Sequence, residues 1–167
     1  MLALSHAQTS DGLKSVLMQQ KLKRVFVASN NQEAVSQLGE QAYNMILIEE
    51  GFPELGGADF CRFLRMTDGP MAVAPIIYGI ISPEKGRVLA ARDAGASKIV
   101  IMPLSPKKLL QTIHAAIKEM RPIIQTTAYR GPDRRMMGPK PFHGPDKRKI
   151  QKGLVSVAEQ KRIIGSF

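Results

Sequence analysis

Residues 44–57 read Asn-Met-Ile-Leu-Ile-Glu-Glu-Gly-Phe-Pro-Glu-Leu-Gly-Gly, and this stretch decides the fold. Its four consecutive apolar residues lack the alternation of a half-exposed strand, which predicts a strand buried on both faces in a parallel sheet. The carboxylates of Glu49 and Glu50 follow directly, at the edge where open parallel sheets bind their ligands. Pro53 and the glycines at 56–57 then close a loop before a helical pattern. The stretch therefore predicts an α/β fold with a candidate site at Glu49.

The remainder of residues 1–120 predicts further strands and helices in alternation. Apolar, β-branched runs favour strands, and apolar residues at helical spacing favour helices. The last helix is expected to bury Leu109, Ile113, Ile117 and Met120. Five strands alternating with five helices predict a five-stranded parallel sheet, doubly wound and flavodoxin-like. Strands are expected at residues 1–4, 24–28, 45–48, 75–81 and 98–102, and helices at residues 9–23, 33–40, 58–66, 83–93 and 106–120.

The excess positive charge of the chain lies after residue 120. Residues 1–120 carry 13 basic and 11 acidic side chains, a net charge of +2. Residues 121–167 carry 11 basic and 3 acidic side chains, a net charge of +8. A strongly basic segment attracts anions, so an anionic partner would explain the charge of residues 121–167, whereas the charge of residues 1–120 requires no such partner. We therefore expect one domain at residues 1–120 and a basic extension at residues 121–167, called the tail below.

Composition argues against several other classes of protein. The single cysteine, Cys61, excludes an internal disulfide framework and is typical of a reducing compartment. No signal peptide is evident, and no apolar run approaches the roughly 18 residues of a membrane span. His6 and His114 lack partners at a spacing that indicates catalysis or a metal site. We expect a soluble, cytoplasmic protein that is not an enzyme and has no cofactor.

Two segments resemble the receiver domain of response regulators, the CheY-like family. One is residues 49–57, where an acidic residue is followed four positions later by Pro and then by Gly. The other is residues 94–104, similar to the end of receivers, where Gly-Ala precedes the fifth strand and Lys-Pro follows it. The resemblance implies strand order 2-1-3-4-5. It also implies a partner surface made by the fourth helix, fifth strand and fifth helix.

At the positions that the resemblance assigns to the phosphorylation site of the family, this chain has residues of different chemistry. In the family, an acidic pair after the first strand holds Mg²⁺ and an Asp accepts the phosphoryl group. A Ser or Thr and a Lys contact that group, and an aromatic residue acts as a switch. At these positions, in the same order, this chain has Ser5, His6, Glu49, Ile80, Met102 and Ile99.

These replacements predict a site that is not phosphorylated. Mg²⁺ prefers carboxylate and phosphate oxygens, and phosphoryl transfer depends on positioning and on stabilisation of charge. Ser82 lies two residues beyond the position of the hydroxyl, and Ile80, Ile99 and Met102 are expected to pack as core. Glu49 leaves two alternatives open. It can imitate a phosphorylated Asp through its extra methylene, or it is a solvated carboxylate at a strand end.

The tail repeats the motif aromatic-basic-Gly-Pro-Asp-basic-basic. It occurs at residues 129–135 and, thirteen residues later, at residues 142–148. The Gly-Pro step favours a turn, and the Gly, Pro, Arg and Lys content predicts mostly irregular backbone. Residues 153–167 predict a short amphipathic helix that docks on the domain or on a partner. The candidate ligand-binding residues are Tyr129, Arg130, Asp133, Arg134, Arg135, Phe142, His143, Asp146, Lys147 and Arg148.

Three interpretations of the tail remain open. It is a solvated segment without a ligand, or it binds nucleic acid through its charge and its stacking rings, or it binds cyclic-di-GMP. The last rests on Arg130 and Asp133, an Arg-x-x-Asp pattern similar to the allosteric site of diguanylate cyclases. Arg can pair with phosphate in two hydrogen bonds, and Asp can accept from the guanine edge.

The sequence thus favours a non-phosphorylatable, receiver-like signalling module that acts through protein–protein interaction. The expected partner is a signalling protein, such as a kinase or another two-component protein, and the tail is a second binding element. The first alternative is a receiver-like sensor of cyclic-di-GMP. The second is nucleic-acid binding through the tail.

Overall fold

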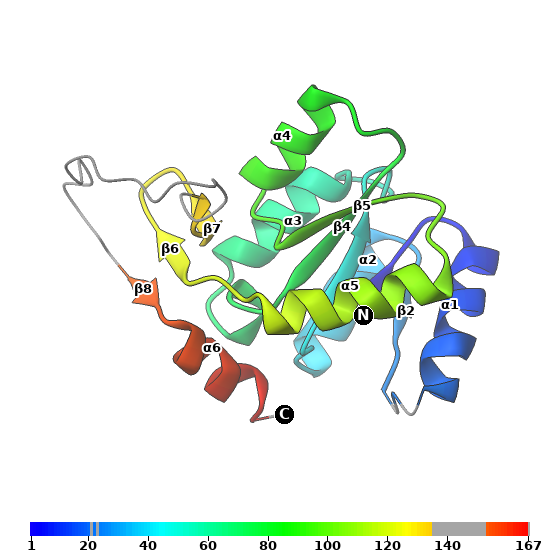
Figure 1. The fold of residues 1–167 in the computed structure, drawn as a ribbon, viewed down its shortest axis with the longest axis horizontal. Helices are drawn as coiled ribbons and strands as arrows, with labels where there is room; N and C mark the ends of the chain where they lie inside the picture. Colours follow the sequence, from blue (N-terminus) through cyan, green and yellow to red (C-terminus); the bar gives the residue numbers. More distant parts are fainter. Residues whose placement is uncertain (21, 23, 135–152, 167) are drawn as a thin grey trace.

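The computed structural model describes residues 1–20, 22, 24–134 and 153–166. A five-stranded parallel sheet forms its centre, in the order β2-β1-β3-β4-β5 that the resemblance implies (Figure 1). The expected α/β doubly wound fold is confirmed. The strands are β1 (Leu2–Ala3), β2 (Val27–Ala28), β3 (Ile46–Glu49), β4 (Ile76–Ile80) and β5 (Lys98–Ile101).

Helices cover both faces of the sheet. Helices α1 and α5 share one apolar cluster with the sheet, and α2, α3 and α4 share the other. Asn30 and Ser105 cap α2 and α5, because their side chains accept from the backbone N–H groups of Glu33 and Lys108. The helices are α1 (Ala7–Gln19), α2 (Asn31–Glu40), α3 (Gly57–Met66), the 3₁₀ helix η1 (Pro70–Ala72), α4 (Lys85–Asp93) and α5 (Pro106–Lys118).

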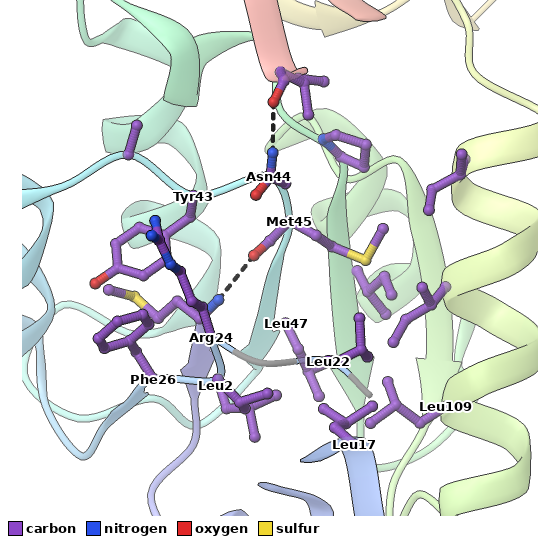
Figure 2. A pocket seen from close by; sticks show the side chains of 18 of the residues that line it. Leu2, Leu17, Leu22, Arg24, Phe26, Tyr43, Asn44, Met45, Leu47 and Leu109 are labelled. Atoms are coloured by element: carbon purple, nitrogen blue, oxygen red, sulfur yellow. Dashed lines mark hydrogen bonds between the residues drawn. The ribbon is translucent and has the colours of Figure 1, made fainter. Parts of the chain in front are cut away.

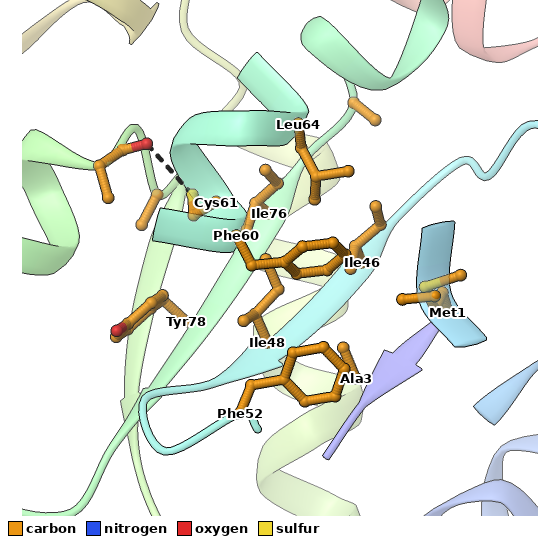
Figure 3. Packing of buried hydrophobic residues seen from close by; sticks show 14 of the residues in the cluster. Met1, Ala3, Ile46, Ile48, Phe52, Phe60, Cys61, Leu64, Ile76 and Tyr78 are labelled. Carbon is orange, nitrogen blue, oxygen red and sulfur yellow. Dashed lines mark hydrogen bonds between the residues drawn. The ribbon is translucent and has the colours of Figure 1, made fainter. Parts of the chain in front are cut away.

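Strand β3 is buried on both faces, as its uninterrupted apolar run predicts. Ile46 and Ile48 point to the side of α3, where Phe60 packs (Figure 3). Leu47 belongs to the other apolar cluster, with residues of α1 and α5. All three strand residues are at most 2% exposed. In α5, in contrast, Ile117 is half exposed rather than buried, because it lies beside a cavity described below.

The described part of the tail is more regular than the irregular backbone we expected. Strands β6 (Ile123–Gln125), β7 (Arg130–Pro132) and β8 (Leu154–Val155) form an antiparallel sheet in the order β7-β6-β8. Helix α6 (Val157–Ile164) follows, which confirms the predicted amphipathic helix. Composition missed these strands because their apolar residues are few, although Ile123 is only 2% exposed.

The tail packs on the receiver-like sheet through close backbone contacts and arginines. Gly131 lies against Gly95 in the turn before β5, and a Cβ added to Gly131 would lie 2.9 Å from Gly95 Cα. Arg121 donates to the carbonyl of Ser97 at 3.2 Å. In α6, Gln160 is buried and donates to the carbonyl of Arg121 at 2.8 Å.

A search of the described residues for a membrane-spanning helix, one with sufficient length and hydropathy, finds no candidate.

Candidate functional site

The parallel sheet brings four of the predicted site residues to one edge. Strands β1, β3, β4 and β5 are neighbours in that order, and their carboxyl ends lie together. Glu49 ends β3, paired with Gly79 of β4, and Ile80 ends β4, paired with Ile101 of β5. Ser5 and Met102 follow β1 and β5, so they lie at the same edge of the sheet as Glu49 and Ile80.

Glu49 is half-buried, and its carboxylate faces β1. The Oε2 atom accepts hydrogen bonds from the backbone N–H and the hydroxyl of Ser5, both at 2.9 Å. Hydrogen bonds to an ionised acceptor are stronger than those between neutral groups. The carboxylate is therefore held by two donors rather than merely solvated, and it points away from β4 and β5.

Apolar side chains occupy the part of the edge formed by β4 and β5. Met102 packs directly on Gly79, where an added Cβ would lie 2.9 Å from Met102 Cγ and Sδ. Ile80 is 1% exposed in the cluster under α3, and Ile99 packs against the same cluster. Ile80 therefore packs as core, as expected, whereas Ile99 and Met102 are partly buried against the two apolar clusters. The peptide bond between Met102 and Pro103 is cis.

The sequence reasoning missed a second carboxylate contact at this edge. Glu50 Oε2 accepts from Arg87 Nη1 of α4 at 2.7 Å and from the backbone N–H of Ile81 at 3.4 Å. The carboxylate raises the pKa of Arg87, mainly through this hydrogen bond. Glu50 thus joins the loop after β3 to α4. The sequence showed two adjacent carboxylates at the end of a strand. It did not indicate that Glu50 would pair with Arg87.

Two further polar residues considered for this site, Ser82 and His6, have other surroundings. The Ser82 hydroxyl donates to Glu84 Oε1 at 2.7 Å, ahead of α4. His6 is exposed at the N-cap of α1. The ring of Tyr78 on β4 is 2% exposed and packs in the core, and this burial raises the pKa of its hydroxyl above the usual value (Figure 3).

The residues at this edge do not fit the Mg²⁺ that the fold family implies. Mg²⁺ demands a near-octahedral set of oxygens, usually with one or two carboxylates. Here the Glu49 carboxylate accepts a hydrogen bond from the Ser5 hydroxyl, and the Glu50 carboxylate forms a salt bridge with Arg87. Across the described residues, no three His, Cys, Asp or Glu side chains are grouped to hold a metal ion.

Residues 129–134 of the first repeat in the tail fold against the sheet domain. Arg130 Nη1 donates to the carbonyl of Thr67 at 3.1 Å, at the end of α3. Arg134 stacks on the Tyr129 ring, 3.7 Å from its centroid, and pairs with Asp93 of α4 at 2.5 Å. Arg130 and Arg134 therefore bind residues of the sheet domain that are so distant in sequence that no motif could indicate them.

Asp133 takes part in the same packing through its backbone. Its N–H donates to the carbonyl of Pro122 at 2.8 Å, and its carbonyl accepts from Arg121 at 3.1 Å. Whether any tail residue also binds a ligand stays a prediction. The remaining candidates lie outside the described residues: Arg135, Phe142, His143, Asp146, Lys147 and Arg148.

Comparison with known proteins decides the family. The family model of the response regulator receiver domain matches residues 5–114. The chain belongs to this family. Residues 5–114 are therefore the receiver domain of a two-component response regulator.

Two curated relatives show how far the similarity extends. The uncharacterised transcriptional regulatory protein YkoG of Bacillus subtilis is 28% identical over 95 residues, 57% of this chain and 40% of the relative. The DNA-binding response regulator MtrA of Mycolicibacterium smegmatis is 25% identical over 92 residues, 55% of this chain and 39% of the relative. The matched region thus spans about two fifths of the length of these relatives.

Solved structures share the fold of this receiver domain. The chemotaxis response regulator CheY4 of Vibrio cholerae superposes with a TM-score of 0.64 at 17% identity, covering 69% of this chain and 94% of that chain. The response regulator DrrB of Thermotoga maritima gives a TM-score of 0.62 at 20% identity, covering 71% of this chain and 51% of that chain. At such identities the likeness concerns the fold alone.

Proposed function

We propose that this receiver domain is not phosphorylated and acts as a protein-interaction module in signal transduction. The observation that carries the proposal is the contact between Glu49 and Ser5. The carboxylate at the acceptor position already accepts two hydrogen bonds from Ser5, at 2.9 Å each. Ser5 stands where the family has one of its metal-binding acids. A hydrogen-bond donor to Glu49 therefore takes the place of a carboxylate that would bind Mg²⁺.

The other half of the edge supports the same proposal. A phosphoryl group needs cationic or hydrogen-bonding partners for its oxygens. Met102 and Ile80 offer neither, and Met102 covers Gly79 with an apolar side chain. With Glu50 bound to Arg87, the loop after β3 and helix α4 are already joined. The module thus presents one surface to a signalling partner, such as a kinase, without a phosphorylation step.

Mg²⁺ binding tests this proposal directly. Calorimetric titration with MgCl₂ is expected to give no saturable heat for the native chain. The double variant Ser5→Asp, His6→Asp returns two carboxylates beside Glu49 and should gain measurable Mg²⁺ affinity, because hard cations bind clustered carboxylates. The control variant Gln19→Glu adds an acid at the far end of α1, away from this edge, and should bind none. Saturable Mg²⁺ binding by the native chain that Glu49→Gln removes would contradict the proposal.

A pair of substitutions tests whether Glu49 imitates a phosphorylated Asp. Glu49→Gln keeps an oxygen that can accept from Ser5, so the free energy of unfolding should change by less than about 1 kcal/mol. Hydrogen exchange at Ile81 and in α4 should stay unchanged, because Glu49 contacts neither. Glu50→Gln should instead raise exchange there, since it removes the charge that binds Arg87. Increased exchange at α4 in Glu49→Gln would support the phosphate-mimic alternative.

The two alternatives for the tail stay predictions. A bound cyclic-di-GMP would have to draw Arg130 from Thr67 and Arg134 from Asp93. The nucleotide should then bind more weakly to Asp133→Ala, since Asp can accept from the guanine edge. Nucleic acid should bind more tightly to the same variant, because a negative charge next to phosphates is removed.

A further inference from the structure

A large cavity opens at the edge of the sheet opposite Glu49. It is lined by residues that precede or begin β1, β2, β3 and β4, and by residues of α1, α5 and α6. Its volume is about 820 Å³, within the range of roughly 300–1,000 Å³ found for small-molecule sites. Figure 2 shows Leu17, Leu47 and Leu109 on one side and Arg24 beside Phe26 and Tyr43 on the other. The cavity is separate from the phosphorylation-site edge.

The floor of the cavity consists of core side chains. Leu17, Leu47 and Leu109 are at most 4% exposed, and they come from α1, β3 and α5. Ile117 of α5 stands at the side and is 50% exposed. Burying a methylene group is worth about 0.8 kcal/mol, so an alkyl chain seated here gains affinity with its length.

The charged residues that line the cavity carry one sign. Among the described lining residues, the charged side chains are Arg24, before β2, and Lys161, on α6, and no carboxylate is present. Both are exposed, so their charges lie at the mouth and not among the leucines. A guanidinium can bind a carboxylate through two parallel hydrogen bonds. The charge of the cavity therefore complements an anionic head group on an apolar chain.

Helix α6 closes the cavity on one side. Lys161, Ile164 and Gly165 line it, and Asn44 donates to the carbonyl of Ile164 at 2.5 Å, which joins the end of α6 to the segment before β3 (Figure 2). A site walled by the sheet edge and by three helices suits a slender ligand better than a partner helix, which is about 10 Å wide. We propose that this cavity binds a free long-chain carboxylate, with its chain on the leucines and its head group between Arg24 and Lys161.

Fluorescence of cis-parinaric acid, a long-chain carboxylate, tests the proposal on the full chain. The native protein should bind it, and laurate should displace it while hexanoate does not. Arg24→Glu with Lys161→Glu should weaken binding about tenfold or more, because both head-group partners become repulsive. The matched control, Lys85→Glu with Lys107→Glu, makes the same change of charge away from the cavity and should alter the affinity less than about twofold. Ile117→Trp, at an exposed position, should fill the mouth and weaken binding about tenfold.

Several results would overturn the proposal. One is an absence of binding by the native chain, and another is an unchanged affinity in the Arg24→Glu, Lys161→Glu variant with its circular dichroism intact. Displacement by the uncharged dodecyl maltoside as efficient as by laurate would show apolar adsorption alone. Binding only to phosphatidylglycerol vesicles would assign the surface to a membrane. A dimer in light scattering that Ile117→Trp dissociates would assign the cavity to a second copy of the chain.

Discussion

Replacement of Arg65 by Met is expected to destabilise the fold by about 3 kcal/mol or more, since each buried carbonyl left without a donor costs about 1–3 kcal/mol. Arg65 lies on α3 and is 1% exposed. Its Nε and Nη2 atoms donate to the carbonyl of Gly95 at 3.0 and 2.9 Å. Its Nη1 atom donates to the carbonyls of Ala72 and Ala74 at 2.9 and 2.8 Å. One side chain thus joins α3, η1 and the turn before β5.

Urea denaturation measures this effect against two controls. Arg65→Lys keeps the charge but lacks the planar guanidinium group, so it should lose part of these hydrogen bonds. Its free energy of unfolding should lie between those of the native protein and Arg65→Met. Arg62→Met removes a neighbouring exposed arginine, which pairs with the exposed Asp59 at 2.5 Å, and should cost less than about 1 kcal/mol. An Arg65→Met protein that unfolds at the same urea concentration as the native protein would contradict the stabilising role of Arg65. Because Gly95 also contacts Gly131, the variant should loosen the tail as well.

The second large effect is expected for Gly57→Ala, at the start of α3. A Cβ at this position would lie 2.1 Å from the carbonyl oxygen of Glu49 and 3.1 Å from Glu50 Cα. These are backbone atoms that a rotamer change cannot move, so the end of β3 must shift. We expect a loss of about 2–3 kcal/mol, as for overpacked cores.

The shift should also reach the candidate site. Because the end of β3 carries Glu49, the Ser5 hydroxyl and N–H should lose their acceptor, and amide exchange at Ser5 should rise. Gly51→Ala in the same loop is the control: its Cβ would meet nothing within 4 Å, and its stability should change by less than about 0.5 kcal/mol. A Gly57→Ala protein with native stability and native exchange at Ser5 would contradict the close approach of α3 to β3.

The sequence predicted those parts of the structure that depend on local pattern. The uninterrupted apolar run of β3 identified a strand buried on both faces, and Ser105 followed by Pro106 identified the start of α5. Strand order came from the resemblance, because parallel strands are paired by crossovers that leave no local mark on the residues.

Contacts between distant residues could not be predicted. Nothing near Arg65 in the sequence indicates that its guanidinium binds carbonyls before and after β4, because charged side chains are usually exposed. The tail shows the same limit. Its arginines suggested an anionic ligand, yet Arg134 pairs with Asp93, and the motif glycine Gly131 serves close packing on Gly95.

At the candidate site, the sequence predicted apolar packing but not the polar contacts. Ile80 packs as core, as expected, and Met102 is partly buried against Gly79. The two donors from Ser5 to Glu49 and the link from Glu50 to Arg87 depend on loop geometry after β1 and β3. Residue type alone does not specify that geometry.

The most direct test of the central claim is the intact mass of the protein after incubation with acetyl phosphate and Mg²⁺. Because Ser5 occupies the Glu49 carboxylate and Met102 covers the adjoining edge, the mass should remain that of the unmodified chain. A receiver domain with an intact acidic pair, Asp and Lys, treated in parallel, serves as the positive control. A gain of one phosphoryl group, located by peptide mapping at Glu49 or at Asp59 of α3, would contradict the proposal.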